Sequence, residues 1–179
     1  ACTDCPKGRY GQNTGQASED SCDDCDAGTH AASTGQSSCD SCAQGEYSGE
    51  SGSENCTPCA VGRFASKTGE AACEKCGAGK KAATTGLTYD CDTCPAGKFS
   101  NEERTVCEPC ESGKFSEPGS LQCTSCPGGK VTSSDQTECV DCGLGRYSST
   151  TTTCDDCPKG RYSKELASAS CSKCAVGYY

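Results

Sequence analysis

The sequence has no tryptophan, no methionine, only three phenylalanines and a single histidine, His30. Apolar residues make up 32% of the 179 residues, but that fraction includes 22 cysteines. The other apolar side chains are too few to bury the core that a chain of this length ordinarily has. Hydrophobicity this low is typical of disordered chains, so any order must come from cross-links.

Further absences exclude whole classes of function. No apolar run is long enough to cross a bilayer, so we expect no membrane insertion in this segment. A net charge of −9 argues against nucleic acid and anionic membranes as partners. The chain offers no Ser-His-Asp set and no phosphate-binding loop, so we expect no enzyme, no catalytic residue and no cofactor. It begins and ends in mid-pattern, which suggests a window of a longer protein.

The chain is rich in cysteine and glycine, with 22 of each. All 22 cysteines fall in eleven Cys-x-x-Cys pairs, from Cys2/Cys5 to Cys171/Cys174. The first cysteine of each pair follows the previous one by 15 to 20 residues. A period of this kind along the whole chain, residues 1–179, predicts a continuous array of short repeats.

Cysteine pairs at this spacing are compatible with disulfides, with zinc sites or with redox sites. Zinc sites of four cysteines use pairs two at a time, and eleven pairs leave one over. The chain is also acidic and almost without histidine, and nothing surrounds the pairs with the βαβ pattern of a redox motif. We therefore interpret the cysteines as structural disulfides, expect no metal, and expect an extracellular or cell-surface location.

Connectivity is not determined by sequence alone. The simplest pattern joins the second cysteine of each pair to the first of the next and leaves Cys2 and Cys174 over. A staggered pattern, first with third and second with fourth, is the rival. Each loop of the simple pattern is worth roughly 3 kcal/mol through loop-closure entropy. Its bridges, which also bound the repeat units, are Cys5–Cys22, Cys25–Cys39, Cys42–Cys56, Cys59–Cys73, Cys76–Cys91, Cys94–Cys107, Cys110–Cys123, Cys126–Cys139, Cys142–Cys154 and Cys157–Cys171.

A glycine follows the second cysteine of every pair by three residues, which predicts positive φ or a close backbone approach. These glycines are Gly8, Gly28, Gly45, Gly62, Gly79, Gly97, Gly113, Gly129, Gly145, Gly160 and Gly177. Two residues later an aromatic side chain follows in eight repeats, and a small residue comes next. The aromatics are Tyr10, Tyr47, Phe64, Phe99, Phe115, Tyr147, Tyr162 and Tyr179; His30, Lys81 and Val131 take the place in the other three.

Each aromatic has two interpretations. It covers a neighbouring disulfide as the small core of its repeat, or it forms part of an exposed stripe that binds a partner. We favour the first, because each repeat has almost nothing else to bury. A small polar residue followed by glycine, from Thr14-Gly15 to Thr85-Gly86, predicts a turn at the tip of each of the first five loops. No stretch has helical periodicity, so we expect short irregular strands, turns and coil.

Charged residues recur at fixed places in the repeat. Basic residues follow the repeat glycine in eight repeats, and acidic residues gather at the cysteine pairs. This pattern is typical of a solvated surface with weak ion pairs, or alternatively of pairing between repeats or chains.

Residues 55–57, Asn-Cys-Thr, form an N-glycosylation sequon at Asn55, although its cysteine could be bridged early.

Residues 2–10 (CTDCPKGRY) and 154–162 (CDDCPKGRY) show the repeat unit best. The unit resembles the ephrin-receptor-like cysteine-rich repeat and is similar to the first module of tumour-necrosis-factor-receptor cysteine-rich domains. The resemblance implies an extracellular, rod-like stack of disulfide-linked loops and supports the simple pairing. Receptors of the tumour-necrosis-factor class mix module types, whereas this array is uniform, which weakens a ligand-binding interpretation.

Together these features predict an elongated rod of about eleven small disulfide-rich repeats with little regular secondary structure and no helix-based core. The expected function is that of an extracellular structural or assembly module in a cell-surface or filament-forming protein. Its expected partner is itself, through polymerisation or lateral assembly, or another extracellular protein, and glycans are compatible with it. The alternative is the stalk of a ligand-binding or adhesive receptor ectodomain.

Overall fold

The computed structural model describes residues 4–11 and 21–175. These residues contain no α-helix and form ten separate antiparallel sheets of two short strands each. They divide into two compact units, which are the described parts of residues 1–77, 81–92 and 103–106, and the described parts of residues 78–80, 93–102 and 107–179. The expectation of small disulfide-rich β-repeats with little regular structure is confirmed. Among the described residues, no helix has the length and apolar character needed to cross a membrane.

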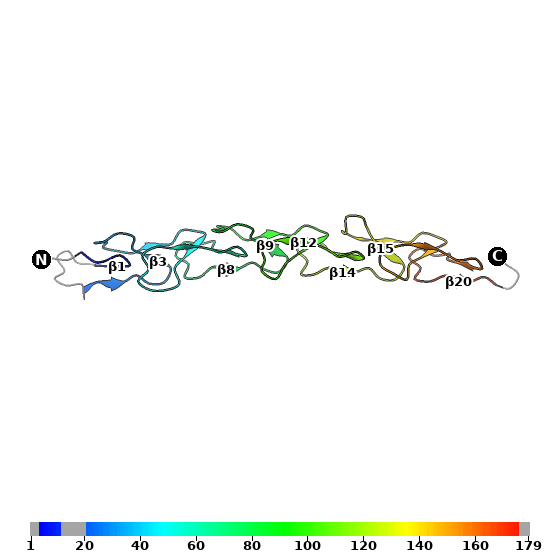
Figure 1. The fold of residues 1–179 in the computed structure, drawn as a ribbon, viewed down its shortest axis with the longest axis horizontal. Helices are drawn as coiled ribbons and strands as arrows, with labels where there is room; N and C mark the ends of the chain where they lie inside the picture. Colours follow the sequence, from blue (N-terminus) through cyan, green and yellow to red (C-terminus); the bar gives the residue numbers. More distant parts are fainter. Residues whose placement is uncertain (1–3, 12–20, 176–179) are drawn as a thin grey trace. The chain divides into compact units, whose positions relative to one another are not determined.

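Each sheet pairs consecutive strands of the chain. The strands are β1 (Arg9–Tyr10), β2 (Asp23–Asp24), β3 (Thr29–His30), β4 (Asp40–Ser41), β5 (Glu46–Tyr47), β6 (Thr57–Pro58), β7 (Arg63–Phe64), β8 (Glu74–Lys75), β9 (Lys80–Lys81), β10 (Asp92–Thr93), β11 (Lys98–Ser100), β12 (Cys107–Pro109), β13 (Lys114–Phe115), β14 (Thr124–Ser125), β15 (Lys130–Thr132), β16 (Cys139–Asp141), β17 (Arg146–Tyr147), β18 (Asp155–Asp156), β19 (Arg161–Tyr162) and β20 (Ser172–Lys173). Figure 1 shows β1, β3 and β8 following one another along the first unit, and β12, β14, β15 and β20 along the second.

The repeat motif explains each hairpin. A β-turn follows the second cysteine, as where the Glu46 N–H donates to the Ala43 carbonyl at 3.1 Å, and Gly45 holds the third turn position at φ +81°. A type II turn requires positive φ at that position, so glycine is placed there. The two residues that follow the glycine, here Glu46 and Tyr47, make the first strand. The two residues between the cysteines of the next pair lie within the second strand, so Tyr47 faces Thr57.

Ten disulfides close the loops, and each joins the second cysteine of one pair to the first cysteine of the next, from Cys5–Cys22 to Cys157–Cys171. Their Cα–Cα distances are between 5.6 and 5.8 Å, the usual separation for an unstrained bridge. These are the pairs of the simple pattern, not the staggered one. Cys174 is the one described cysteine without a bridge, and Cys2 lies outside the described residues.

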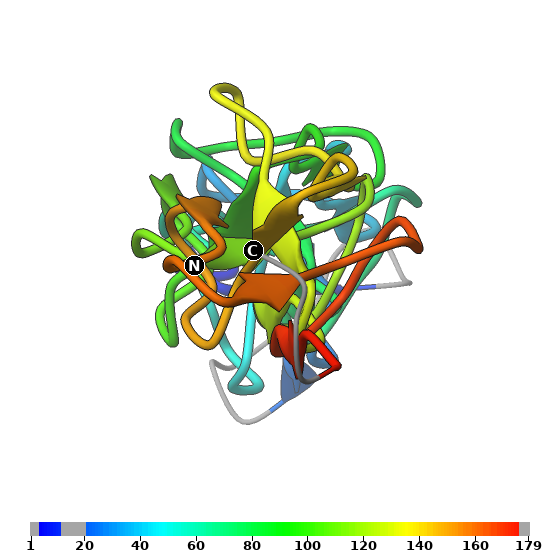
Figure 2. The ribbon, with the colours of Figure 1, turned by 90° about the vertical axis from the view of Figure 1, so that its right-hand side faces the viewer.

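The buried interior consists mainly of cysteines and small side chains. Cys25, Cys42, Cys59, Cys94 and Cys142 are completely buried. Only two large apolar side chains, Phe64 and Leu87, are buried among the described residues. Figure 2 shows the loops of the second unit, drawn in yellow, orange and red, pointing outward in different directions from its strand pairs. Each repeat therefore depends on its bridge and on its neighbours, because it has no core of its own.

Candidate functional site: the interface between repeats

Consecutive repeats are joined by main-chain hydrogen bonds, and the repeat closed by Cys42–Cys56 shows the pattern. Its Gly45 N–H donates to the Ala65 carbonyl of the next repeat at 2.8 Å, and its Ser48 N–H donates to the Glu70 carbonyl at 3.2 Å. In return the Gly69 N–H, at the tip of the next loop, donates to the Cys42 carbonyl at 2.8 Å. Three hydrogen bonds, each worth about 1 kcal/mol, thus fix one repeat on the next.

The same three bonds recur within both units. The bond from the repeat glycine is Gly8 to Ala31, Gly28 to Ser48, Gly62 to Ala82, Gly97 to Ser116, Gly129 to Ser148 and Gly145 to Ser163. In the Cys76–Cys91 repeat the acceptor is instead a side chain, because the Gly79 N–H donates to Ser100 Oγ at 2.9 Å. The tip bond recurs as Gly35 to Cys5, Gly52 to Cys25, Gly86 to Cys59, Gly119 to Cys94 and Ala167 to Cys142.

The small residue after each aromatic lies at the centre of this interface. Ala65 accepts a hydrogen bond from the repeat before it and donates one to Leu87 of the repeat after it. It is only 3% exposed, and Ala31, Ala82, Ser116 and Ser148 are buried to the same degree. A larger side chain would separate the two neighbours, which explains why every complete repeat has a small residue there.

The repeat glycines also contact the next repeat but one. A Cβ on Gly45 would lie 2.3 Å from the carbonyl oxygen of Gly86, which is at the tip of that loop. Equivalent contacts place Gly8 against Gly52, Gly28 against Gly69 and Gly79 against Gly119. Glycine is therefore required at this position for two reasons, the positive φ of the turn and the close approach of another backbone.

Loop tips without glycine keep a similar backbone. Ala167 takes the tip position with φ 54°, and Arg104 and Gln136 hold positive φ in two other loops. In the Cys126–Cys139 loop the Gln136 side chain donates through Nε2 to the Cys110 carbonyl at 2.7 Å, in place of a main-chain donor. The different turn sequences of the later repeats are thus compatible with one mode of docking. Thr14-Gly15 lies outside the described residues.

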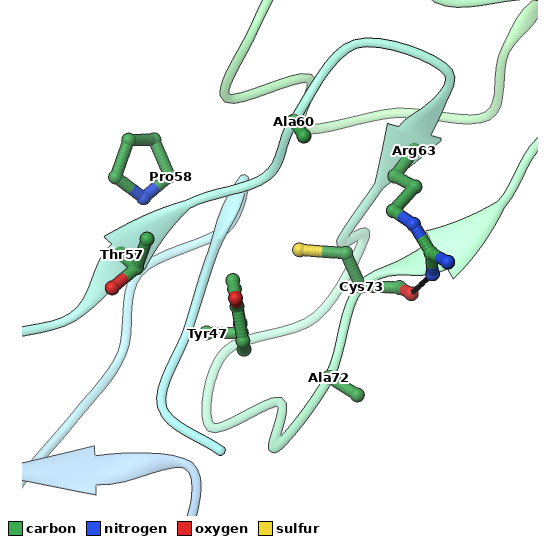
Figure 3. Close-up of a pocket in the computed structure, with 7 residues that line it drawn as sticks. All are labelled: Tyr47, Thr57, Pro58, Ala60, Arg63, Ala72 and Cys73. Atoms are coloured by element: carbon green, nitrogen blue, oxygen red, sulfur yellow. Dashed lines mark hydrogen bonds between the residues drawn. The ribbon is translucent and has the colours of Figure 1, made fainter. Parts of the chain in front are cut away.

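Two aromatic residues cover the bridge of the following repeat. Tyr47 packs against the cluster of Cys59, Ala65 and Cys73. Phe64 is 8% exposed and lies in a cluster with Cys76 and Cys91. Figure 3 shows the Tyr47 ring beside Cys73, with Arg63 donating from Nη1 to the Cys73 carbonyl at 2.9 Å. For these two residues the structure agrees with a covering role.

The other aromatics are less buried. Tyr10, Phe99, Phe115 and Tyr147 are half-buried, and Tyr162 is 43% exposed. Tyr179 and Gly177 lie outside the described residues. Phe99 lines a shallow cleft with Pro109, Lys114 and Cys123. Tyr47 lines an equivalent cleft with Pro58, Arg63 and Cys73, so an aromatic, a proline and a base recur together at a position that the sequence motif alone did not reveal.

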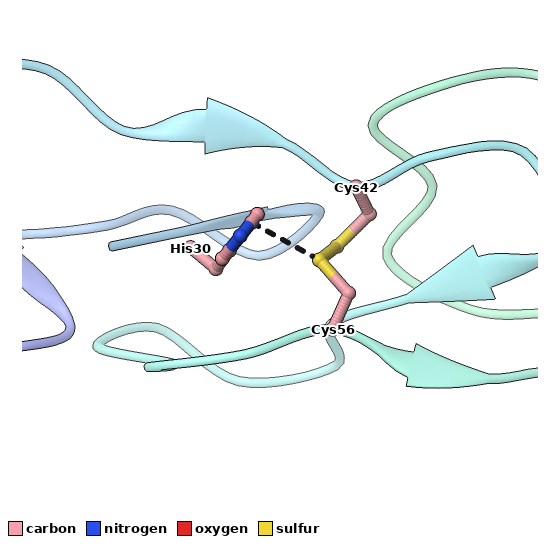
Figure 4. A group of neighbouring side chains, drawn as sticks. All are labelled: His30, Cys42 and Cys56. Carbon is pink, nitrogen blue, oxygen red and sulfur yellow. Dashed lines mark hydrogen bonds between the residues drawn. A yellow bond between two sulfur atoms is a disulfide. The ribbon is translucent and has the colours of Figure 1, made fainter. Parts of the chain in front are cut away.

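His30 takes the place of an aromatic in its repeat, above the bridge Cys42–Cys56 (Figure 4). Its Nδ1 is 3.2 Å from Cys56 Sγ and 3.1 Å from the Asp40 carbonyl. Because a carbonyl only accepts, these contacts favour a proton on Nδ1. His30 and the two sulfurs have the donor types and the proximity of a metal site. Both sulfurs are bonded to each other, however, and metal binding requires thiolates.

The charged residues form ion pairs inside hairpins. Arg9 pairs with Asp24 at 2.8 Å, and two further cross-strand pairs are Lys130–Asp141 at 2.8 Å and Arg146–Asp156 at 3.0 Å. Glu111 pairs with Lys114 at 2.7 Å, and this hydrogen-bonded contact lowers the pKa of the Glu111 carboxyl. These pairs lie at the surface, where each is worth under about 1 kcal/mol. They do not connect one repeat to another.

The arginines of the repeat motif have a second role. Arg9, Arg63, Arg146 and Arg161 each donate to the carbonyl of the cysteine that closes their own loop, at 2.6 to 3.1 Å. The bond ties the first strand of each hairpin to the bridge. The geometry of one repeat thus accounts for an arginine after the repeat glycine.

The comparisons with known proteins agree with this geometry. The family described as tyrosine-protein kinase ephrin type A/B receptor-like matches residues 45–91. This stretch includes the interfaces around Gly45, Ala65 and Ala82. A search of curated proteins found no match. The matched family is a receptor-like cysteine-rich module, and the likeness to tumour-necrosis-factor receptors has no counterpart in these findings. The chain is therefore a cysteine-rich repeat array, and its residues 45–91 are similar to the ephrin-receptor-like family.

Proposed function

We propose that the chain is a structural module of a cell-surface or filament-forming protein, in which it acts as a stiff spacer. The many bridges and the ephrin-receptor-like match favour an extracellular location, because disulfides persist in oxidising compartments. The finer role, a spacer that holds two attached parts at a fixed separation, goes beyond the family match. It rests on how the repeats dock.

The observation that carries the proposal is the repeated main-chain docking. Most of the described repeat glycines meet the next repeat by a hydrogen bond and the next but one by direct contact, as Gly45 does with Ala65 and Gly86. Because main-chain bonds recur with the same partners, their geometry varies little with side-chain identity. A spacer needs this property, since its length must depend on the number of repeats and not on local sequence.

Repeat deletion tests the spacer role. Removing residues 42–58 joins Ser41 to Cys59 and keeps a Cys-x-x-Cys pair, Cys39/Cys59. Removing residues 42–75 joins Ser41 to Cys76 in the same way and deletes two repeats. We expect the longest dimension in small-angle X-ray scattering to fall by two equal steps. A dimension that does not follow the number of repeats would remove the basis of the proposal.

In a filament-forming protein the module would also bind other copies of the same chain. Identical surfaces at regular intervals suit lateral or end-to-end contacts. Sedimentation of the purified chain over a range of concentrations, with electron microscopy of the same samples, tests this self-association. Filaments or concentration-dependent oligomers support it. A chain that stays monomeric at every concentration excludes self-assembly and leaves the spacer role.

A ligand-binding receptor stalk is the second candidate, and the equivalent clefts at Tyr47 and Phe99 favour it. Each combines a ring, a proline and a base, which suits a partly apolar side chain of an extracellular protein; the Phe99 cleft also holds Glu111, the ion-pair partner of Lys114. Immobilised chain and its Arg63→Ala, Lys114→Ala double variant can be compared for capture of soluble extracellular proteins. Capture that the double variant loses supports this candidate over a passive spacer.

A further inference from the structure

The sequon at residues 55–57 leads into the second strand of the hairpin formed by β5 and β6 in the first unit. The chain has three asparagines, Asn13, Asn55 and Asn101, and only Asn55 has a hydroxyl residue two positions later. N-glycosylation requires that hydroxyl and an accessible asparagine. The extracellular location argued above would bring the chain to the transferase, so the inference rests on the proposed function.

The hairpin of β5 and β6 presents the two sequon residues together. Thr57 stands opposite Tyr47 in the register, which brings their side chains close together. Asn55 and Thr57 are both exposed and line one shallow cleft with Tyr47 and Ser53. Among the described contacts the Asn55 side chain has no hydrogen-bond partner, so nothing in the fold competes for its amide. Figure 3 shows Thr57 and the Tyr47 ring on neighbouring strands of this hairpin.

Cys56 does not line that cleft. Its Sγ is bonded to Cys42 and contacts His30 (Figure 4). In the folded repeat the bridge therefore leaves Asn55 exposed, although it fixes the backbone on which the sequon lies.

We propose that Asn55 is an N-glycosylation site whose first sugar lies in the cleft beside Tyr47. The donor is an oligosaccharide on a lipid diphosphate. Asn55 Nδ2 bonds to the anomeric carbon of the first N-acetylglucosamine, the carbon–oxygen bond to the diphosphate breaks, and the amide loses one proton. The Tyr47 ring then offers an apolar face to the sugar, and the polar edge of the cleft accepts its hydroxyl and amide groups.

The order of events follows from the bridge. Transfer requires a flexible acceptor segment, and closing Cys42–Cys56 fixes residues 55–57 in the hairpin. Glycan transfer must therefore precede bridge closure, and the two reactions compete. Occupancy in the native chain is then incomplete, and it rises when the bridge cannot form.

The test uses the full chain secreted from a eukaryotic cell line behind an added leader, with intact mass measured before and after peptide-N-glycosidase. We expect glycan on Asn55 in part of the wild-type molecules and none on Thr57→Val, which keeps the asparagine. The double variant Cys42→Ala, Cys56→Ala should be occupied in a larger fraction. Asn101 serves as the unmodified internal control. Wild-type chain without glycan at Asn55 overturns the proposal, whatever the variants show.

A thiol count on the same samples separates this result from the proposed function. Secreted chain with all ten bridges closed but no glycan contradicts the inference alone. Secreted chain with many free thiols contradicts the extracellular module itself. The role of the ring is read from the rate of enzymatic glycan release under native conditions. Tyr47→Phe should leave that rate unchanged and Tyr47→Ala should raise it severalfold, whereas equal rates in all three chains refute the position assigned to the sugar.

Discussion

The substitution Gly45→Ala tests the docking of repeats most sharply. Gly45 has φ +81°, and a Cβ there would lie 2.3 Å from the Gly86 oxygen and 2.8 Å from the Gly86 carbonyl carbon. Both atoms belong to backbone, which is held by the Gly86 N–H bond to Cys59. The neighbouring loop tip must therefore move to accommodate a single methyl group.

The expected cost has two parts. An alanine at positive φ costs about 1–2 kcal/mol through its own backbone. Moving the Gly86 tip breaks at least one main-chain hydrogen bond, and a buried group left without its partner costs about 1–3 kcal/mol more. The two parts together give about 2–5 kcal/mol of local destabilisation.

Gly145→Ala is the matched control. Gly145 holds the same position in its own repeat at φ +76°, but no atom of the described residues lies within 4 Å of a Cβ built on it. Its substitution by alanine should therefore cost only the backbone strain at positive φ, about 1–2 kcal/mol. The difference between the two variants isolates the contact between a repeat and the next but one.

Amide hydrogen exchange reports each effect locally. The Cys59 N–H donates to the Gly45 carbonyl at 2.8 Å, and the Cys157 N–H donates to the Gly145 carbonyl at the same distance. The Cys59 amide should lose about 5-fold to 150-fold more protection in Gly45→Ala than the Cys157 amide loses in Gly145→Ala, since the extra cost is about 1–3 kcal/mol and tenfold corresponds to about 1.4 kcal/mol. Equal losses in the two variants would refute the docking contact, because both then reflect the turn alone.

Three further changes test other parts of the account. Phe64→Ala should lower the free energy of unfolding by about 3 kcal/mol in a thermal unfolding experiment, because it leaves a cavity in a buried cluster. Tyr162→Ala should lower it by much less, because Tyr162 is exposed. The Asp135 carboxyl should titrate by NMR below its ordinary range, because hydrogen bonds, first from the Ser133 hydroxyl and then from Thr137, lower its pKa. The lowered pKa of Asp135 stabilises the folded chain at pH values above the unfolded pKa, and this stabilisation is lost as the pH falls through the lower folded pKa. Ser133→Ala should raise the titration midpoint of Asp135. Arg146→Gln should change stability by about 1 kcal/mol, because its ion pair with Asp156 and its hydrogen bond to the Cys154 carbonyl both lie at the exposed surface.

The sequence predicts the class of fold and the role of the glycines because both depend on local chemistry. A Cys-x-x-Cys pair followed by glycine specifies a bridge and a turn wherever it occurs. The approach of Gly45 to Gly86 is different, since it joins residues two repeats apart. No local pattern contains that distance, and the sequence shows only that both positions are glycine.

The charged residues show a second limit. The basic residues that follow the glycine in eight repeats are compatible with pairing inside a repeat or between repeats. The register decides between them, because Arg146 lies opposite Asp156 and the guanidinium also reaches the Cys154 carbonyl. Likewise, His30 breaks the aromatic pattern in the sequence, yet its ring lies on the Cys42–Cys56 bridge as an aromatic ring would.

Disulfide mapping tests the central claim, that each bridge closes one repeat and each repeat docks on the next. The secreted chain is alkylated without reductant, digested under non-reducing conditions and analysed by mass spectrometry. The account predicts sequential links such as Cys42–Cys56 and Cys59–Cys73. Staggered links, such as Cys42 with Cys59, or widespread alkylated thiols, would contradict it.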